Sequence, residues 1–92
     1  MKIVADMSLY PLRDGPIPAI IEFIEDLQQQ EGIEIVSNQL STQVKGSFEA
    51  VTGAINDCMK KTMEVSNTVV LVVKYLNIDV EINTAPTLTP SS

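Results

Sequence analysis

The fold of this chain is decided by residues 68–76, Thr68-Val69-Val70-Leu71-Val72-Val73-Lys74-Tyr75-Leu76. A run so rich in valine and leucine predicts a buried β-strand. Apolar residues fall on both faces of such a strand: Val69, Leu71 and Val73 on one, and Val70, Val72 and Leu76 on the other. Helices of the same chain can cover one of these faces. We therefore expect the other face to pack against a second copy of the chain.

The N-terminal part of the chain predicts a strand followed by a helix. Lys2 to Tyr10 alternates apolar and polar residues with the period of two that marks a half-buried strand. Pro11 ends this strand because proline has no N–H to donate. Asp14-Gly15-Pro16 then predicts a turn and a helix start, and Gly32 is the expected stop. The helix carries apolar residues at helical spacing: Ile17, Ile20, Ile21, Ile24 and Leu27.

A hairpin and a second helix are predicted next. Strands are expected at 33–36 and 40–46, joined by the turn residues Ser37-Asn38-Gln39. Ser47 is a suitable N-cap for the second helix. Gly53 inside that helix costs up to about 1 kcal/mol relative to alanine, so we expect close packing there. The apolar stripe of this helix comprises Phe48, Val51, Ile55, Cys58, Met59, Thr62 and Met63.

The element order strand-helix-strand-strand-helix-strand predicts an α+β fold of the ferredoxin-like, split βαβ type. In this fold two helices lie on one face of a four-stranded antiparallel sheet. We assign residues 1–77 to this domain and expect it to bind a ligand. Residues 78–92 form a C-terminal extension. The alternation of apolar and acidic residues over 78–82 allows a short additional strand, and the Thr/Pro/Ser-rich remainder predicts a flexible tail.

The composition argues against several classes of partner. A net charge of −6 disfavours nucleic acid and anionic membranes, which attract Lys and Arg. The sequence shows no secretory signal and no apolar stretch of the roughly 20 residues that a membrane span needs. With one cysteine, Cys58, and no histidine, the usual zinc and iron ligand sets are absent. We therefore expect a cytoplasmic protein that binds no metal and needs no cofactor.

The sequence also offers no catalytic constellation. Cys58 has no histidine to activate it and lies on the apolar stripe of a predicted helix. Ser41 and Lys45 could form a Ser–Lys pair, but four residues along a strand span about 13 Å. No Gly-rich phosphate-binding loop is present. We expect the chain not to be an enzyme.

Two segments with small hydroxyls and backbone amides, Ser8-Leu9-Tyr10-Pro11 and Ser41-Thr42, remain as candidates for a binding site. In the predicted fold the first and third strands are neighbours, so these segments can lie side by side. The strand end before Pro11 offers free N–H and C=O groups, which an aminopyrimidine needs for its ring nitrogen and amino group. Tyr10 could stack on a ring or a cation. The simpler alternative is that Ser41 and Thr42 only stabilise a turn and that Tyr10 lies at the rim of a surface or in an interface.

The chain resembles the YkoF-like family of thiamine- and hydroxymethylpyrimidine-binding proteins. The resemblance covers residues 2 to about 76 and rests on Met7-Ser8-Leu9-Tyr10-Pro11-Leu12 and on residues 40–51, which begin Leu40-Ser41-Thr42-Gln43-Val44-Lys45-Gly46-Ser47. It implies a ferredoxin-like fold, no catalysis and a homo-oligomer, either a dimer or a tetramer. It also implies that thiamine or its hydroxymethylpyrimidine precursor is bound by Ser8, Leu9 (through its backbone), Tyr10, Ser41 and Thr42, with Asn38 as a further candidate. Asp6 is a guess for the carboxylate that faces the thiazolium cation.

The resulting hypothesis is a binding protein for one of these vitamin forms, acting in salvage, transport or sensing. The alternative is a structural or regulatory interaction module that assembles through its sheet face.

Overall fold

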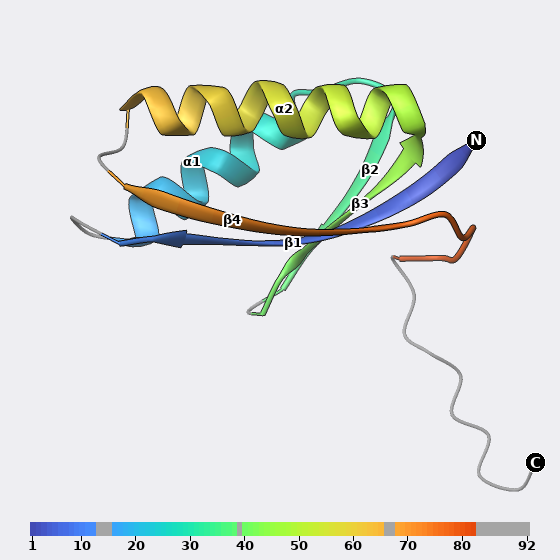
Figure 1. Ribbon diagram of the computed structural model, residues 1–92, viewed down its shortest axis with the longest axis horizontal. Helices are drawn as coiled ribbons and strands as arrows, with labels where there is room; N and C mark the ends of the chain where they lie inside the picture. The colour runs from blue at the N-terminus through green and yellow to red at the C-terminus, as the bar shows by residue number, and fades with distance from the viewer. Residues whose placement is uncertain (13–15, 39, 66–67, 83–92) are drawn as a thin grey trace, which may run out of the picture.

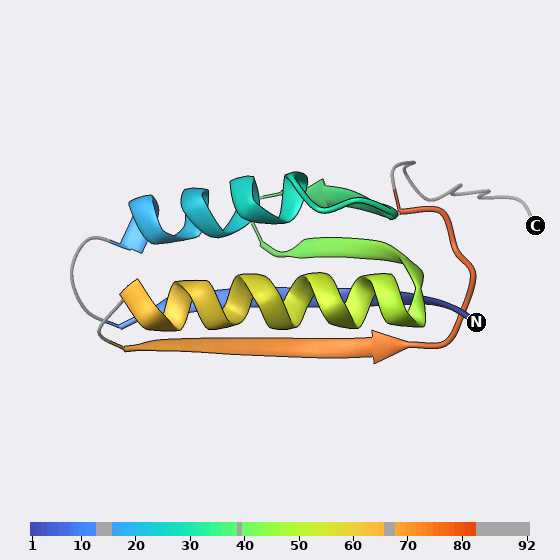
Figure 2. The ribbon, with the colours of Figure 1, turned by 90° about the horizontal axis from the view of Figure 1, so that it is seen from above.

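The computed structural model describes residues 1–12, 16–38, 40–65 and 68–82. Its elements follow the predicted order: β1 (Lys2–Pro11), α1 (Pro16–Gln28), β2 (Ile33–Ser37), β3 (Thr42–Ser47), α2 (Phe48–Val65) and β4 (Val69–Leu76). The four strands form one antiparallel sheet in the order β2-β3-β1-β4. Both helices lie on the same face of that sheet (Figures 1 and 2). The α+β ferredoxin-like prediction is therefore confirmed.

The hydrophobic core lies between the sheet and the two helices. The alternating residues Ile3, Ala5 and Met7 of β1 are buried there, as the period of two predicted. Phe23 and Leu27 of α1 and the inner side of α2 complete the core. From the predicted α2 stripe, Phe48 and Met63 remain about half exposed, because they lie at the margin of the buried face.

The two helices begin and end close to the predicted signals. Ser47 Oγ accepts a hydrogen bond from Ala50 N at 3.1 Å, which confirms its role as the N-cap of α2. Helix α1 ends at Gln28, earlier than the predicted stop at Gly32, because Leu27 is its last buried residue and only polar residues follow. Gly32 instead takes a positive φ of 79° in the turn into β2.

The expectation of close packing at Gly53 is wrong. Gly53 lies on the exposed face of α2, and a Cβ added there would meet no atom within 4 Å. The cost of glycine at this position is therefore not offset by a tight contact among the described residues.

The additional strand allowed by the alternation over 78–82 is not formed, since residues 77–82 have no strand structure. This segment turns back beneath the sheet on the side away from the helices (Figure 1). There Asp79 Oδ1 lies 2.7 Å from Lys45 Nζ, and Val4 and Lys45 are only 4% and 5% exposed although no helix covers them. The Asp79 carboxylate, as hydrogen-bond partner and opposite charge, raises the pKa of Lys45. The tail predicted for the remaining residues lies outside the described part of the chain.

Candidate functional site

Strand β1 has a neighbour on both edges along only part of its length. Its pairing with β3 ends at Met7, opposite Thr42, whereas its pairing with β4 continues to Pro11, opposite Val69. Within the described part of the chain, residues 8–10 are therefore paired on the β4 edge alone. The strand predicted for 40–46 begins only at Thr42, and this late start leaves the edge open.

The backbone of Leu9 faces this open edge. Leu12 N donates to Thr68 O on the β4 side, and Phe48 N donates to Met1 O on the β3 side, both at 2.9 Å. Successive residues of a strand point their N–H and C=O groups to opposite edges, so these two bonds show which residues of β1 face which neighbour. The N–H and C=O groups of the odd-numbered residues, including those of Leu9, point towards β3. Among the described residues no backbone hydrogen bond reaches Leu9 from that side.

A hollow of about 260 Å³ lies at this edge of the sheet. Helix α1 supplies an apolar wall of Ile20, Phe23 and Ile24, while Met7 and Leu40 also contribute. All the residues predicted for the binding site line the same hollow: Ser8, Leu9, Tyr10, Asn38, Ser41 and Thr42. That these residues bind a ligand stays a prediction. The apolar wall was not predicted as part of a site, because the isoleucine stripe of α1 indicated only a core-facing helix.

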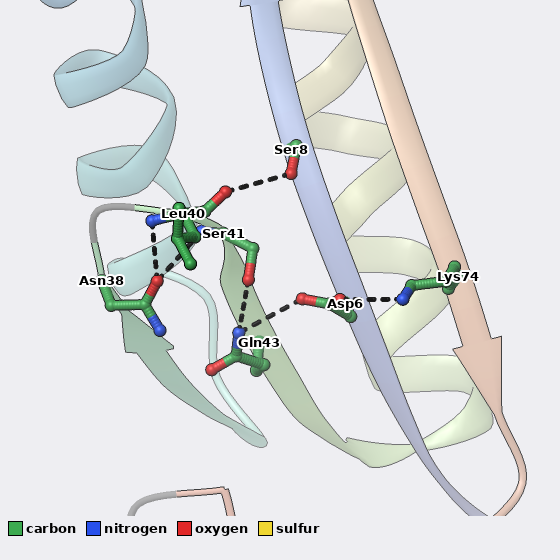
Figure 3. A network of polar contacts seen from close by, with 7 residues as sticks. All are labelled: Asp6, Ser8, Asn38, Leu40, Ser41, Gln43 and Lys74. Atoms are coloured by element: carbon green, nitrogen blue, oxygen red, sulfur yellow. Dashed lines mark hydrogen bonds and ion pairs between the residues drawn. The ribbon is translucent and has the colours of Figure 1, made fainter.

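Asn38 shapes the turn between β2 and β3. Its Oδ1 accepts hydrogen bonds from Leu40 N at 2.8 Å and from Ser41 N at 3.0 Å (Figure 3). Its own N–H donates to Ser41 O at 3.0 Å. This side-chain turn holds Leu40 and Ser41 out of the β ladder and explains why β3 starts late.

Ser41 and Thr42 point to opposite faces of the sheet, as their adjacent positions predicted. The Thr42 hydroxyl is buried and hydrogen-bonded to the Ser37 hydroxyl. Ser41 Oγ accepts from Gln43 Nε2 at 2.6 Å on the face away from the helices (Figure 3). Of the two hydroxyls, that of Ser41 is the more available to a ligand.

Ser8 and Tyr10 stand on the same face of β1 as Ser41. Ser8 Oγ donates to Leu40 O at 3.3 Å, which joins β1 to the turn, and both residues line the hollow. The Tyr10 side chain is 51% exposed and lies opposite Val70 in the register with β4. Its ring is free to cover a bound molecule or a partner.

Asp6 does not line the hollow. Its Oδ1 accepts from Gln43 Nε2 at 3.2 Å, and its Oδ2 lies 3.4 Å from Lys74 Nζ. The nearby Ser41 hydroxyl is the largest influence that lowers the pKa of Asp6, followed by Gln43 and Lys74. The guess that Asp6 faces a cation is therefore not supported by its position, since Lys74 already lies beside it.

Three further features bear on other functions. Burial raises the pKa of the Cys58 thiol, which keeps it in the unreactive protonated form. Across residues 1–12, 16–38, 40–65 and 68–82, no group of three or more His, Cys, Asp or Glu side chains could hold a metal ion. No helix in the described part of the chain is both long and apolar enough to span a bilayer.

Comparisons with known proteins extend the fold but not the function. No protein-family model matches the sequence, and no curated protein does either. A solved structure from Streptococcus pneumoniae is 23% identical with a TM-score of 0.79, covering 87% of this chain and 90% of its own. A Thermotoga maritima protein, described provisionally as one of thiamine biosynthesis or salvage, is 16% identical with a TM-score of 0.78, covering 89% and 91%.

A third similar structure is a domain of unknown function, DUF77, from Bacillus cereus. It is 14% identical with a TM-score of 0.69, and the match covers 95% of this chain and 83% of that chain. At these identities the likeness to all three structures shows a shared fold.

Proposed function

We propose that this chain is a non-enzymatic, cytoplasmic binding protein for thiamine or its hydroxymethylpyrimidine precursor, acting without a cofactor in vitamin salvage, transport or sensing. The observation that carries the proposal is the hollow at the open edge of β1, into which the N–H and C=O groups of Leu9 point. The thiamine-related description of the Thermotoga maritima neighbour agrees with it. The paired motifs Ser8-Leu9-Tyr10 and Ser41-Thr42 meet at this hollow.

The chemistry of the hollow suits a small aminopyrimidine. Such a ring presents an acceptor nitrogen beside an amino donor, which complements one N–H and one C=O of a free strand edge. Apolar side chains of α1 would cover the ring face, and hydrogen bonds in such a partly dry site discriminate strongly between donors and acceptors. At about 260 Å³, the hollow is at the small end for ligand sites, which favours a single heterocycle over a dinucleotide.

Isothermal titration calorimetry with thiamine and with hydroxymethylpyrimidine tests the proposal. We expect dissociation constants of micromolar order and a rise in Tm at saturating ligand, because a ligand that binds only the folded state stabilises it. Ser41→Ala is expected to weaken binding while the protein remains folded. The absence of both heat and thermal shift at millimolar concentrations of either compound would reject the proposal.

The second candidate function, an interaction module that assembles through its sheet face, is favoured by exposed apolar residues on that face. Tyr10 pairs with Val70 there, Val72 and Leu76 follow further along the same face of β4 with Lys74 between them, and none of the four apolar residues is buried. Under this candidate, and for a homo-oligomer that also binds the vitamin, a second copy covers them. Light scattering for the oligomer mass and calorimetric titration for the ligand affinity distinguish the two surfaces. Val72→Asp should lower the oligomer mass. Ser41→Ala with Thr42→Ala should lower ligand affinity and leave the mass unchanged.

A further inference from the structure

Residues 77–82 form a strap on the outer face of the sheet, which is the face away from the helices. The strap crosses from the end of β4 towards β2 (Figures 1 and 2). Two of its carboxylates reach Lys45 of β3: Asp79 Oδ1 lies 2.7 Å from Lys45 Nζ, and Glu81 Oε1 lies 4.0 Å from it. Within the described part of the chain, no backbone hydrogen bond joins the strap to the sheet. Its polar attachment therefore depends on Lys45.

The strap lies over a part of the outer face that no helix covers. Lys45 stands opposite Val4 of β1 in the strand register, and Val4 stands opposite Leu76 of β4. Val4 and Lys45 are nearly buried, whereas Leu76 is exposed. The surface under the strap, which includes Val4 and the aliphatic stem of Lys45, is thus continuous with the exposed apolar side chains of β4.

The strap and a second sheet cannot occupy this part of the face together. Two sheets that pack face to face lie about 10 Å apart, and their side chains fill the space between them. That spacing leaves no room for a further stretch of backbone. A second copy can therefore reach Val70 and Val72 while the strap is bound, but it cannot pack on Val4.

We propose that the strap is self-inhibitory: while it is bound to Lys45 it keeps a second copy off the Val4 part of the outer face, and its release lets two sheets pack over their whole faces. This inference rests on the second candidate function, assembly through the sheet face, and adds its regulation by a segment of the same chain. The contact that controls release is the pairing of Lys45 with Asp79 and Glu81.

The test follows strap release and association separately. Val4→Cys in a Cys58→Ala background places a thiol under the strap, and its labelling by a small maleimide, at protein concentrations too low for association, reports release. The variant with Asp79→Asn and Glu81→Gln loses both ion pairs to Lys45. It should label about two- to fivefold faster, which is the effect of weakening a partly exposed ion pair.

Association should respond more strongly than labelling. A second sheet packs fully only on the open form, so the apparent dissociation constant falls as the open fraction of each copy rises. Analytical ultracentrifugation of the chain without the probe cysteine measures this constant. Because both copies must open, the constant for the Asp79→Asn, Glu81→Gln variant should fall by more than the labelling ratio and by up to its square, roughly 4- to 25-fold.

Two further variants complete the design. Glu22→Gln with Glu25→Gln changes the net charge by the same amount at exposed positions of α1, on the other side of the sheet, and should leave labelling unchanged. Lys45→Met removes the other partner of the ion pairs and should also speed labelling. Added to the Asp79→Asn, Glu81→Gln variant, it should have no further effect on labelling, because both changes break the same contact.

The outcomes separate the two proposals. Equal labelling of the wild-type strap and of the strap without its carboxylates overturns the attachment through Lys45. Faster labelling with an unchanged dissociation constant overturns the inhibitory role and leaves the assembly candidate standing. No association by any variant, even with the strap released, overturns assembly through the sheet face and the inhibitory role together.

Discussion

The two halves of strand β1 share one pattern of alternating residues but lie in different surroundings. In the first half, up to Met7, the strand has β3 on one edge and β4 on the other, and Ile3, Ala5 and Met7 are almost fully buried. In the second half β3 is missing, so the same pattern places Leu9 beside a hollow. The comparison teaches that this candidate site arises where a neighbouring strand begins late, rather than from an unusual residue.

The largest effect that would test this contrast is on stability. Ile3→Ala removes a side chain that is 3% exposed and should lower the free energy of unfolding by roughly 2–5 kcal/mol, because it leaves a cavity in the core. Tyr10→Ala, at the exposed end of the same strand, should change it by no more than about 0.5 kcal/mol. Urea denaturation measures both values. Similar losses of stability for the two variants would show that the two halves of β1 contribute equally to the core.

A smaller effect is expected on ligand affinity, and here the sensitive half of β1 is the second one. Tyr10→Ala should weaken thiamine binding by roughly 0.5–2 kcal/mol if the ring covers the bound cation or heterocycle. Tyr10→Phe keeps the ring and serves as the matched control, with affinity close to that of the wild type. Calorimetric titration gives both numbers. Equal weakening by the two variants would assign the effect to the hydroxyl instead of the ring.

Gly53→Ala offers a way to change stability without touching either half of β1. Since a Cβ at this exposed helical position meets nothing within 4 Å, alanine should raise the free energy of unfolding by about 0.4–1 kcal/mol. The affinity for thiamine should not change. Thermal unfolding with and without ligand measures both quantities, and a loss of stability would show that Gly53 has a packing role.

The smallest expected effect is the pH dependence contributed by Asp6, which lies next to the border between the halves. Its pKa in the folded protein is below the ordinary value of 3.8, so the folded state binds this proton less readily than the unfolded state. The stabilisation is therefore present above pH 3.8 and is lost as the pH falls through the lower folded value. With a partly exposed side chain it should amount to a few tenths of a kcal/mol.

The difference in unfolding free energy between the wild type and Asp6→Asn, measured by urea denaturation from pH 7 to pH 3, checks this prediction. It should shrink only at the acidic end of that range. A difference that is constant over the whole range would contradict a lowered pKa.

Local signals predicted much of the fold and several residues that line the candidate site. The alternation in Lys2 to Tyr10 identified the buried residues of β1, and Ser47 was correctly placed as an N-cap. The residues expected at the site do surround one hollow. Local signals failed where the answer depended on a distant neighbour: the close packing expected at Gly53 is absent, and residues 78–82, where the alternation allowed an additional strand, instead lie beside Lys45.

The sequence by itself determined the order of strands and helices and the face of each that is apolar, because hydrophobic periodicity and capping act over a few neighbouring residues. Only the tertiary structure decided where β3 begins relative to β1, and thus that Leu9 has no backbone partner on that edge among the residues that the structure describes. It also decided that Ile20, Phe23 and Ile24 form a wall. Register and helix placement depend on contacts between segments far apart in the chain, and no local pattern encodes them.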